Sequence, residues 1–238
     1  MKLGFIGTGT IASAVVEGIA GDGHQITVSE RSRARSADLA ARFGVAVTDN
    51  QGVIDNSDVL FLGLLPDQAA TVLPTLRFHP NQQVISFIAG VSLDRLAPLV
   101  APATPGSVML PFPGIAKGGS PIIALGQTDL IEAIFTPQNS VYSLENDTEL
   151  TAYLCAQAVL SPAVKLVSDA ANWIAPKVSN PAQAEDFLRV LVGSSLMAND
   201  LAPLLQALNT SGGYNARLRE HMDAAGTPEA LQKGLDSL

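Results

Sequence analysis

Charged and aromatic side chains are scarce in this sequence. Of its 238 residues only 15% are Asp, Glu, Lys or Arg and 5% are aromatic, and 14 basic residues stand against 22 acidic ones. The formal net charge of −8 argues against nucleic acid or an anionic membrane surface as the main partner, because both are polyanions. Cys155 is the single cysteine, which excludes an internal disulfide framework and suits a reducing cytoplasm.

Metal-ligand clusters and long apolar runs are missing as well. The three histidines, at positions 24, 79 and 221, are scattered without the spacing of a metal site, so no metal is expected. No uninterrupted apolar run approaches the roughly 18–20 residues of a membrane span. Glu17 and Asp22 also fall where a secretory signal would be uncharged. We therefore expect a soluble, cytoplasmic protein that does not engage a membrane.

What the sequence does have is apolar material in a regular order. Its 47% hydrophobic residues suffice for one sizeable core and a smaller second one. In the first half, short apolar stretches alternate with helical patterns, which predicts parallel strands joined by crossovers and covered on both faces. The expected strands are 2–6, 25–29, 45–47, 58–62 and 82–88, with helices at 10–20, 33–42 and 50–56; further strands at 107–110, 121–124 and 140–143 accompany a helix at 129–135.

The last third of the sequence carries no strand pattern. Ala- and Leu-rich segments at 148–176, 181–208 and 215–225 predict helices, so we place a domain boundary between residues 145 and 146. A helical domain of residues 146–238 with few charges is too small to bury its own apolar surface. We therefore expect a homodimer that forms through these C-terminal helices.

A glycine-rich turn joins the first expected strand to the first expected helix. Residues 7–12, Gly-Thr-Gly-Thr-Ile-Ala, fit the G-x-G-x-x-G/A fingerprint of dinucleotide-binding proteins. Gly7 permits the tight turn, Gly9 lets the backbone approach a pyrophosphate, and Ala12 lets the helix pack closely on the strand. The amides at the helix N-terminus favour the phosphates. Because the motif lies between a strand and a helix, it predicts a dinucleotide site; the alternative is merely a tight connection between the two elements.

The end of the second expected strand bears on the choice of dinucleotide. Glu30 is placed to accept a hydrogen bond from the 2′-hydroxyl of NAD. Arg31, Ser32, Arg33 and Arg35 are placed to surround the 2′-phosphate of NADP, although Ser32 also suits an ordinary helix N-cap. Three arginines so close together in a sequence poor in basic residues favour NADP and leave NAD open.

At this point the sequence resembles the pyrroline-5-carboxylate reductase family. The resemblance implies an N-terminal Rossmann-type doubly wound sheet (residues 1–145), a smaller all-α dimerisation and substrate domain (146–238), and reduction of 1-pyrroline-5-carboxylate to proline with NAD(P)H. It is strongest over the first domain and weaker over the helices. The blocks that carry it are GFIGTGTIASAVVEGI, ITVSERS, VLFLGLLPDQ, VISFIAGVSLDRL, SVMLPFPGIAKGGSPIIAL and LNTSGGYNARL.

The same resemblance implies roles for residues at matching positions. The pyrophosphate would lie on the 7–12 turn and the adenine ribose beside Arg31 and Ser32. Residues along the rest of the cofactor would be Leu64, Leu65 and Pro66, followed by Ala89 and Gly90 near the nicotinamide. The substrate carboxylate would be held by the hydroxyl and backbone amides of Ser211, Gly212 and Gly213.

The sequence departs from the family's pattern mainly on the substrate side. The lysine expected before Pro66 is Leu65, and the asparagine and threonine of a Met-Pro-Asn-Thr stretch are Phe112 and Pro113. A Thr-Thr pair after the double glycine is Tyr214-Asn215. These changes suit a relative with a changed substrate or one without a reaction.

Within this framework the residues near the double glycine are candidates for catalysis. Tyr214 and Ser211 are the catalytic candidates, and Tyr214 would donate a hydrogen bond to the substrate nitrogen or oxygen. Asn215 would be a neighbouring substrate contact and Phe112 an apolar wall. The alternatives are that 210–213 is a plain interhelical turn and that Tyr214 packs at a dimer interface. For the whole protein the alternatives are an NADP-dependent reductase of another imine, keto acid or cofactor, or a non-catalytic NADP(H)-binding protein.

Overall fold

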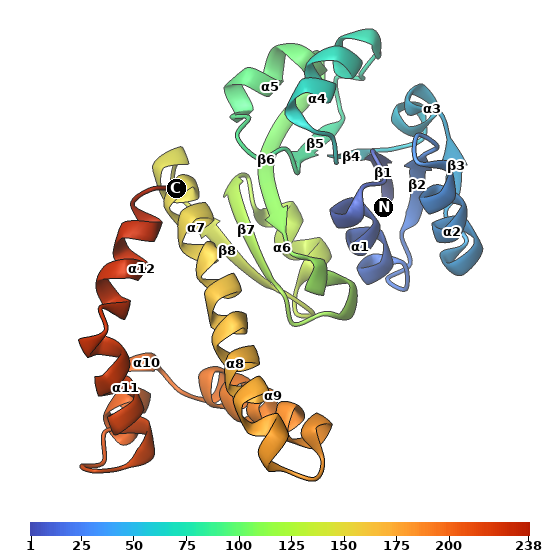
Figure 1. The fold of residues 1–238 in the computed structure, drawn as a ribbon. Helices are drawn as coiled ribbons and strands as arrows, with labels where there is room; N and C mark the ends of the chain where they lie inside the picture. The colour runs from blue at the N-terminus through green and yellow to red at the C-terminus, as the bar shows by residue number, and fades with distance from the viewer. The chain divides into compact units, whose positions relative to one another are not determined.

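The computed structural model describes all 238 residues, and they form two compact units, Met1–Thr151 and Ala152–Leu238. The units part inside helix α7 (Asp147–Ala156), whereas the sequence suggested a boundary between residues 145 and 146. Figure 1 shows the order of the elements along the chain.

The first unit is built on one eight-stranded sheet of order β3-β2-β1-β4-β5-β6-β7-β8. Every neighbouring pair is parallel except β6 and β7, which are antiparallel. The N-terminal Rossmann-type sheet expected from the sequence is confirmed. The strands are β1 (Lys2–Ile6), β2 (Gln25–Ser29), β3 (Ala46–Thr48), β4 (Val59–Leu62), β5 (Gln83–Ser86), β6 (Thr104–Pro111), β7 (Pro121–Gly126) and β8 (Ser140–Leu144).

Helices cover both faces of this sheet and enclose two separate apolar cores. One face carries α1 (Thr10–Ile19), α2 (Arg33–Phe43), the 3₁₀ turn η2 (Pro113–Lys117) and α6 (Asp129–Phe135). The other face carries α3 (Asn50–Asp55), α4 (Pro66–Val72), η1 (Leu73–Thr75) and α5 (Leu93–Val100). The sequence analysis did not anticipate α4, η1 or η2, each of which begins at or next to a proline.

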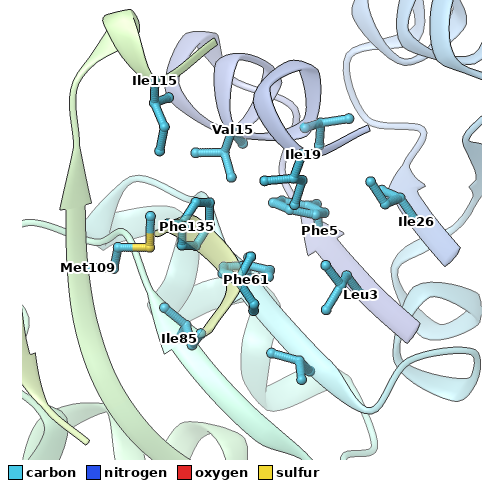
Figure 2. Close-up of a cluster of buried hydrophobic side chains, with 14 of the residues drawn as sticks. Leu3, Phe5, Val15, Ile19, Ile26, Phe61, Ile85, Met109, Ile115 and Phe135 are labelled. Atoms are coloured by element: carbon cyan, nitrogen blue, oxygen red, sulfur yellow. The ribbon is translucent and has the colours of Figure 1, made fainter. Parts of the chain in front are cut away.

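The alternation of side chains along each strand divides the residues between the two cores. In β4, Phe61 points into the core under α1, while Leu60 and Leu62 point into the core under α4 and α5. Phe61 stacks on Phe5 with ring centroids 4.6 Å apart and meets Phe135 edge-on at 6.2 Å. Figure 2 shows these rings at the centre of the cluster. This two-sided burial explains why β1 and β4 read as continuous apolar runs.

Helix α1 is held close to η2 at a glycine. A Cβ on Gly18 would lie 2.5 Å from the backbone oxygen of Ile115, so only glycine allows this approach. Ile115 is buried against α1, as Figure 2 shows beside Val15. The segment that follows Phe112 is therefore fixed to the helix that begins at the glycine turn.

The second unit is entirely helical, with the bounds α8 (Leu160–Ile174), η4 (Ala175–Lys177), α9 (Pro181–Ala198), α10 (Leu201–Ala207), α11 (Tyr214–Ala224) and α12 (Thr227–Leu235). The single helix predicted over 181–208 is divided, because the backbone becomes extended at Asn199. Pro203 in the following turn has no amide hydrogen to continue the helical bonds. The sequence analysis also missed α12.

One helical segment differs from the expectation about membrane spans. Helices α7 and α8, joined by η3 (Gln157–Val159) and extended by η4, run from Asp147 to Lys177, and this segment is long and apolar enough to cross a membrane by length and composition. Only 6% of its most apolar stretch is buried within the chain. A helix in the core of a soluble protein can be equally long and apolar. The segment also carries an ion pair between Lys165 and Asp169.

Candidate functional site

A groove opens at the carboxyl ends of β1 and β4, where the strand order of the sheet reverses. Open parallel sheets bind their ligands at this position. The groove has a volume of about 570 Å³. Of the residues that line it, those already assigned to the cofactor from the sequence are Gly7, Thr8, Gly9, Thr10, Ile11, Ala12, Arg31, Ser32, Arg35, Leu64 and Leu65, and the others are Gly63, Gln68 and Phe87.

Four of the residues assigned to the cofactor, Arg33, Pro66, Ala89 and Gly90, are not part of this lining. Pro66 begins α4 directly after Leu65. Ala89 and Gly90 lie in the turn that follows β5. Gly63, Gln68 and Phe87 lie in blocks that carry the resemblance but were given no role from the sequence; they reach the groove because β4 lies beside β1 and β5 beside β4.

The glycine turn fits its position for steric reasons. Gly7 has a φ of +97°, and a Cβ there would collide with the backbone oxygen of Gly63. A Cβ on Gly63 would in turn lie 3.0 Å from the Cβ of Ala12. At Gly9 a Cβ would meet no atom within 4 Å, so the absence of a side chain leaves open the space above the turn. The backbone is therefore accessible to a ligand at Gly9.

Unsatisfied polar groups at this turn point to an anionic ligand. The N-cap of α1 is Gly9, and no side chain caps the amides of the first helical turn. Thr8 is 3% exposed, and its Oγ1 has no hydrogen-bond partner. A buried hydroxyl without a partner is costly, and a phosphate oxygen would satisfy it. These features fit the pyrophosphate of a dinucleotide.

A buried serine holds the turn in place. The amide of Gly7 donates a hydrogen bond of 2.9 Å to the Oγ of Ser29, which is fully buried at the end of β2. The bond joins the turn to the neighbouring strand and leaves the amides from Gly9 onward for a ligand. The sequence analysis did not single out Ser29, although a serine that ends an apolar strand is an unusual choice for a core position.

The positive charge of the groove is not neutralised by the protein. Arg31 and Arg35 line the groove and form no ion pair. Arg42, further along α2, contacts Glu17 at 2.7 Å and Asp38 at 3.2 Å, and these hydrogen bonds raise its pKa above the usual value. Ser32 does not cap α2 through its side chain, so its hydroxyl is available beside Arg31. This end of the groove can accept an anion.

The residues assigned to the substrate lie elsewhere in the fold. Ser211, Gly212 and Gly213 form the turn between α10 and α11, in which Gly212 has a φ of +72° and the Gly213 amide donates to the Thr210 oxygen at 2.9 Å. Gly213 is the N-cap of α11 and no side chain caps the helix.

Three further residues were assigned to the substrate: Tyr214, Asn215 and Phe112. Tyr214 is 88% exposed and Asn215 is also exposed. Phe112 belongs to the first unit, where it is half-buried before η2, and it does not line the groove. The chain contains no group of three or more His, Cys, Asp or Glu side chains that could hold a metal ion.

Comparison with known proteins supports a nucleotide-binding role for the first unit. Residues 2–90 match the profile of a family described as NADP oxidoreductase coenzyme F420-dependent. The chain is 29% identical over 161 residues to pyrroline-5-carboxylate reductase 1 of Bacillus spizizenii, an alignment that covers 61% of this chain and 54% of the relative. The chain thus spans about half the length of the curated relatives it matches.

Solved structures resemble the chain over its whole length. The pyrroline-5-carboxylate reductase of Streptococcus pyogenes superposes with a TM-score of 0.83 at 22% identity, covering 100% of this chain and 97% of the other. The Plasmodium falciparum pyrroline carboxylate reductase, solved with NADP bound, gives a TM-score of 0.83 at 14% identity, covering 100% and 95%. At these identities the likeness establishes the fold.

Ser29→Ala is expected to destabilise the first unit by about 1–3 kcal/mol, because the buried Gly7 amide loses its only acceptor. Nucleotide binding should weaken in parallel, since the turn is then free to move. Denaturant unfolding and nucleotide titration measure the two effects. The control is Ser140→Ala, at an exposed position of β8, which should stay within about 0.5 kcal/mol of the wild type. Equal stability of the two variants would contradict the role of Ser29.

Proposed function

We propose that the chain is a member of the pyrroline-5-carboxylate reductase family, to which it is similar, and that it is an NAD(P)H-dependent reductase of a small cyclic imino acid, converting 1-pyrroline-5-carboxylate to proline. The observation that carries the proposal is the glycine turn, with the unpartnered hydroxyl of Thr8 and the open backbone at Gly9. Together they fit a pyrophosphate at the point where such sheets bind dinucleotides.

NADP is the proposed cofactor. Arg31 and Arg35 offer two cations without ion-pair partners at the groove end nearest β2, where an adenine ribose would lie, and Ser32 adds a free hydroxyl. A 2′-phosphate would neutralise these cations, whereas the 2′-hydroxyl of NAD would not. Glu30, the residue that would favour NAD, is exposed and does not line the groove. NAD is the weaker candidate.

Imine reduction asks the protein mainly to position and protonate its substrate. When bound, the reduced nicotinamide supplies the hydride that adds to the C=N carbon. Leu64, Leu65 and Phe87 line the groove with apolar surface that excludes water from the reacting atoms. The turn at Ser211–Gly213 offers a hydroxyl and backbone amides for the carboxylate, and the start of α11 adds the positive end of its dipole.

A proton must also reach the substrate nitrogen as the hydride arrives. Tyr214 carries the one hydroxyl directly after the double glycine, and its side chain is almost fully exposed, so it is free to donate to a bound substrate. Asn215 adds a second hydrogen-bonding side chain beside it. We assign the proton donation to Tyr214 and substrate contacts to Ser211 and Asn215.

A second candidate function follows from the altered substrate residues. Phe112 and Pro113 offer no amide or hydroxyl, and Leu65 replaces a lysine expected from the resemblance. Each buried hydrogen bond that the substrate cannot form for this reason weakens its binding by about 1 kcal/mol or more. These changes favour a more apolar imine or keto substrate, or another cofactor, over pyrroline-5-carboxylate. If these changes abolish turnover of every substrate, the protein binds NADP(H) without catalysing a reaction.

We propose in addition that two copies associate through the C-terminal helices. Ala216 is the one buried residue from Ala152 onward, and α8 to α12 expose large apolar side chains such as Phe187 and Leu191. Isolated helices of this kind are not stable in water without a surface to cover them. A second copy supplies such a surface, and the same association would cover the apolar segment Asp147–Lys177 in a soluble dimer.

The purified protein is expected to oxidise NADPH when 1-pyrroline-5-carboxylate is added, with the product identified as proline. Cofactor oxidation is followed by absorbance, with NADH and a carboxylate-free cyclic imine assayed in parallel. Turnover restricted to the carboxylate-free imine would support the second candidate function. Tight NADPH binding without turnover on any imine would contradict reductase activity altogether.

With a substrate that is turned over, Tyr214→Phe should lower kcat by about tenfold or more while leaving NADPH affinity unchanged, because only the proton donor is lost. The ring and its packing surface are retained, so the variant separates the hydroxyl from the aromatic contact. Phe112→Leu serves as a control that should change KM more than kcat. Unchanged kcat in Tyr214→Phe would rule out the assigned role.

The protein is expected to sediment as a dimer at micromolar concentration. Phe187→Glu should shift it toward monomer or cause it to unfold, because a charge enters an apolar contact, while Gln183→Glu on the same helix should leave the dimer intact. Analytical ultracentrifugation with circular dichroism distinguishes dissociation from unfolding. A wild-type monomer, or a protein recovered only with membranes, would contradict the proposal.

A further inference from the structure

One hydrogen bond crosses the groove between segments that are far apart in the sequence. Arg31, just after β2, donates from Nη1 to the Oε1 of Gln68 in the first turn of α4 at 3.0 Å. In the sheet, β1 lies between β2 and β4, so the bond joins the two walls on either side of the glycine turn. Both residues line the groove.

The group that accepts the hydrogen bond from Arg31 is a neutral carboxamide, and its neutrality determines how much positive charge remains on the guanidinium. A carboxylate at this position would orient the guanidinium and cancel its charge, as Glu17 and Asp38 do for Arg42. A carboxamide oxygen orients the guanidinium and leaves the full positive charge in place. The remaining N–H groups of Arg31 have no protein acceptor, and neither does the amide nitrogen of Gln68.

We propose that Gln68 is a positioning residue for the 2′-phosphate of NADP: it holds Arg31 across the groove, uncompensated in charge, and so sets the preference for NADPH over NADH. The inference rests on the proposed function for the presence of a nicotinamide dinucleotide. It goes beyond it by assigning the selectivity to a residue of α4 that the sequence analysis gave no role. Side chains such as Arg31 lose rotamer freedom on binding a phosphate, and an orienting bond made beforehand lowers that cost.

A purely structural role for Gln68 makes a different prediction. Its Oε1 also accepts a hydrogen bond from the Leu65 amide, at 3.5 Å, and so caps the start of α4. If capping were its whole contribution, a substitution would lower stability and weaken both nucleotides alike. If it positions Arg31, the loss is confined to the nucleotide that carries the 2′-phosphate.

The test is direct binding of NADPH and of NADH, measured by fluorescence titration or calorimetry without an imine present. Gln68→Met retains the length of the side chain and its helix propensity but removes the acceptor. We expect about a fivefold or greater loss of NADPH affinity, with NADH affinity changed by less than about twofold. Gln68→Glu introduces the neutralising carboxylate, and we expect it to weaken NADPH further while NADH affinity is retained.

A double-mutant cycle with Arg31→Ala identifies the route of the effect. If Gln68 acts through Arg31, Gln68→Met should have no further effect on NADPH affinity in the Arg31→Ala background. Equal losses for the two nucleotides, no loss at all, or an undiminished effect in that background would each overturn the inference. Thr71→Ala, elsewhere in α4, is the matched control and should leave nucleotide selectivity unchanged.

Failure of this inference is distinguishable from failure of the proposed function. If substitutions of Gln68 reduce the preference for NADPH but the protein reduces no imine, the inference holds and the proposed reductase activity is wrong. A protein that reduces the imine with equal use of both nucleotides in all Gln68 variants removes the inference alone. A wild-type protein that binds neither nucleotide overturns both.

Discussion

The candidate site depends on the close approach of two backbone segments, the turn at Gly7 and the end of β4 at Gly63. A side chain at either position would push the segments apart, since a Cβ on Gly7 collides with the Gly63 oxygen and one on Gly63 presses on Ala12. The contact places the first turn of α1 directly at the end of β1. The hydrogen bond from Gly7 to Ser29 fixes the same turn to β2. The amides from Gly9 onward, which would bind a phosphate, are thus held in place by packing before any ligand arrives.

Charge is used sparingly in this protein, which makes its placement informative. The first unit buries apolar side chains on both faces of its sheet, and the groove wall of Leu64, Leu65 and Phe87 continues that character to the surface. Against this background Arg31 and Arg35 stand without acidic partners, whereas Arg42 nearby has two. A cation that lines a groove without an ion-pair partner has little effect on stability, and its electric field attracts an anionic ligand.

The first unit buries its apolar side chains within the chain, whereas the second unit leaves most of its apolar side chains exposed. The first unit has two closed cores and a groove that fits a dinucleotide by steric, polar and charge criteria. The second unit has exposed apolar helices and a double-glycine turn whose amides are uncapped. The residues that depart from the pattern of the resembled family, such as Leu65 and Tyr214, lie in both units.

The sequence by itself determined the strands β1, β2, β4 and β5, the doubly wound class and the glycine turn, because apolar runs and short-range glycine stereochemistry are local properties. Only the tertiary structure decided which residues share the groove. Gly63, Gln68 and Phe87 reach it through the order of strands in the sheet, which no local pattern encodes. The division of the helix at 199 likewise depends on backbone geometry that helix propensity does not specify.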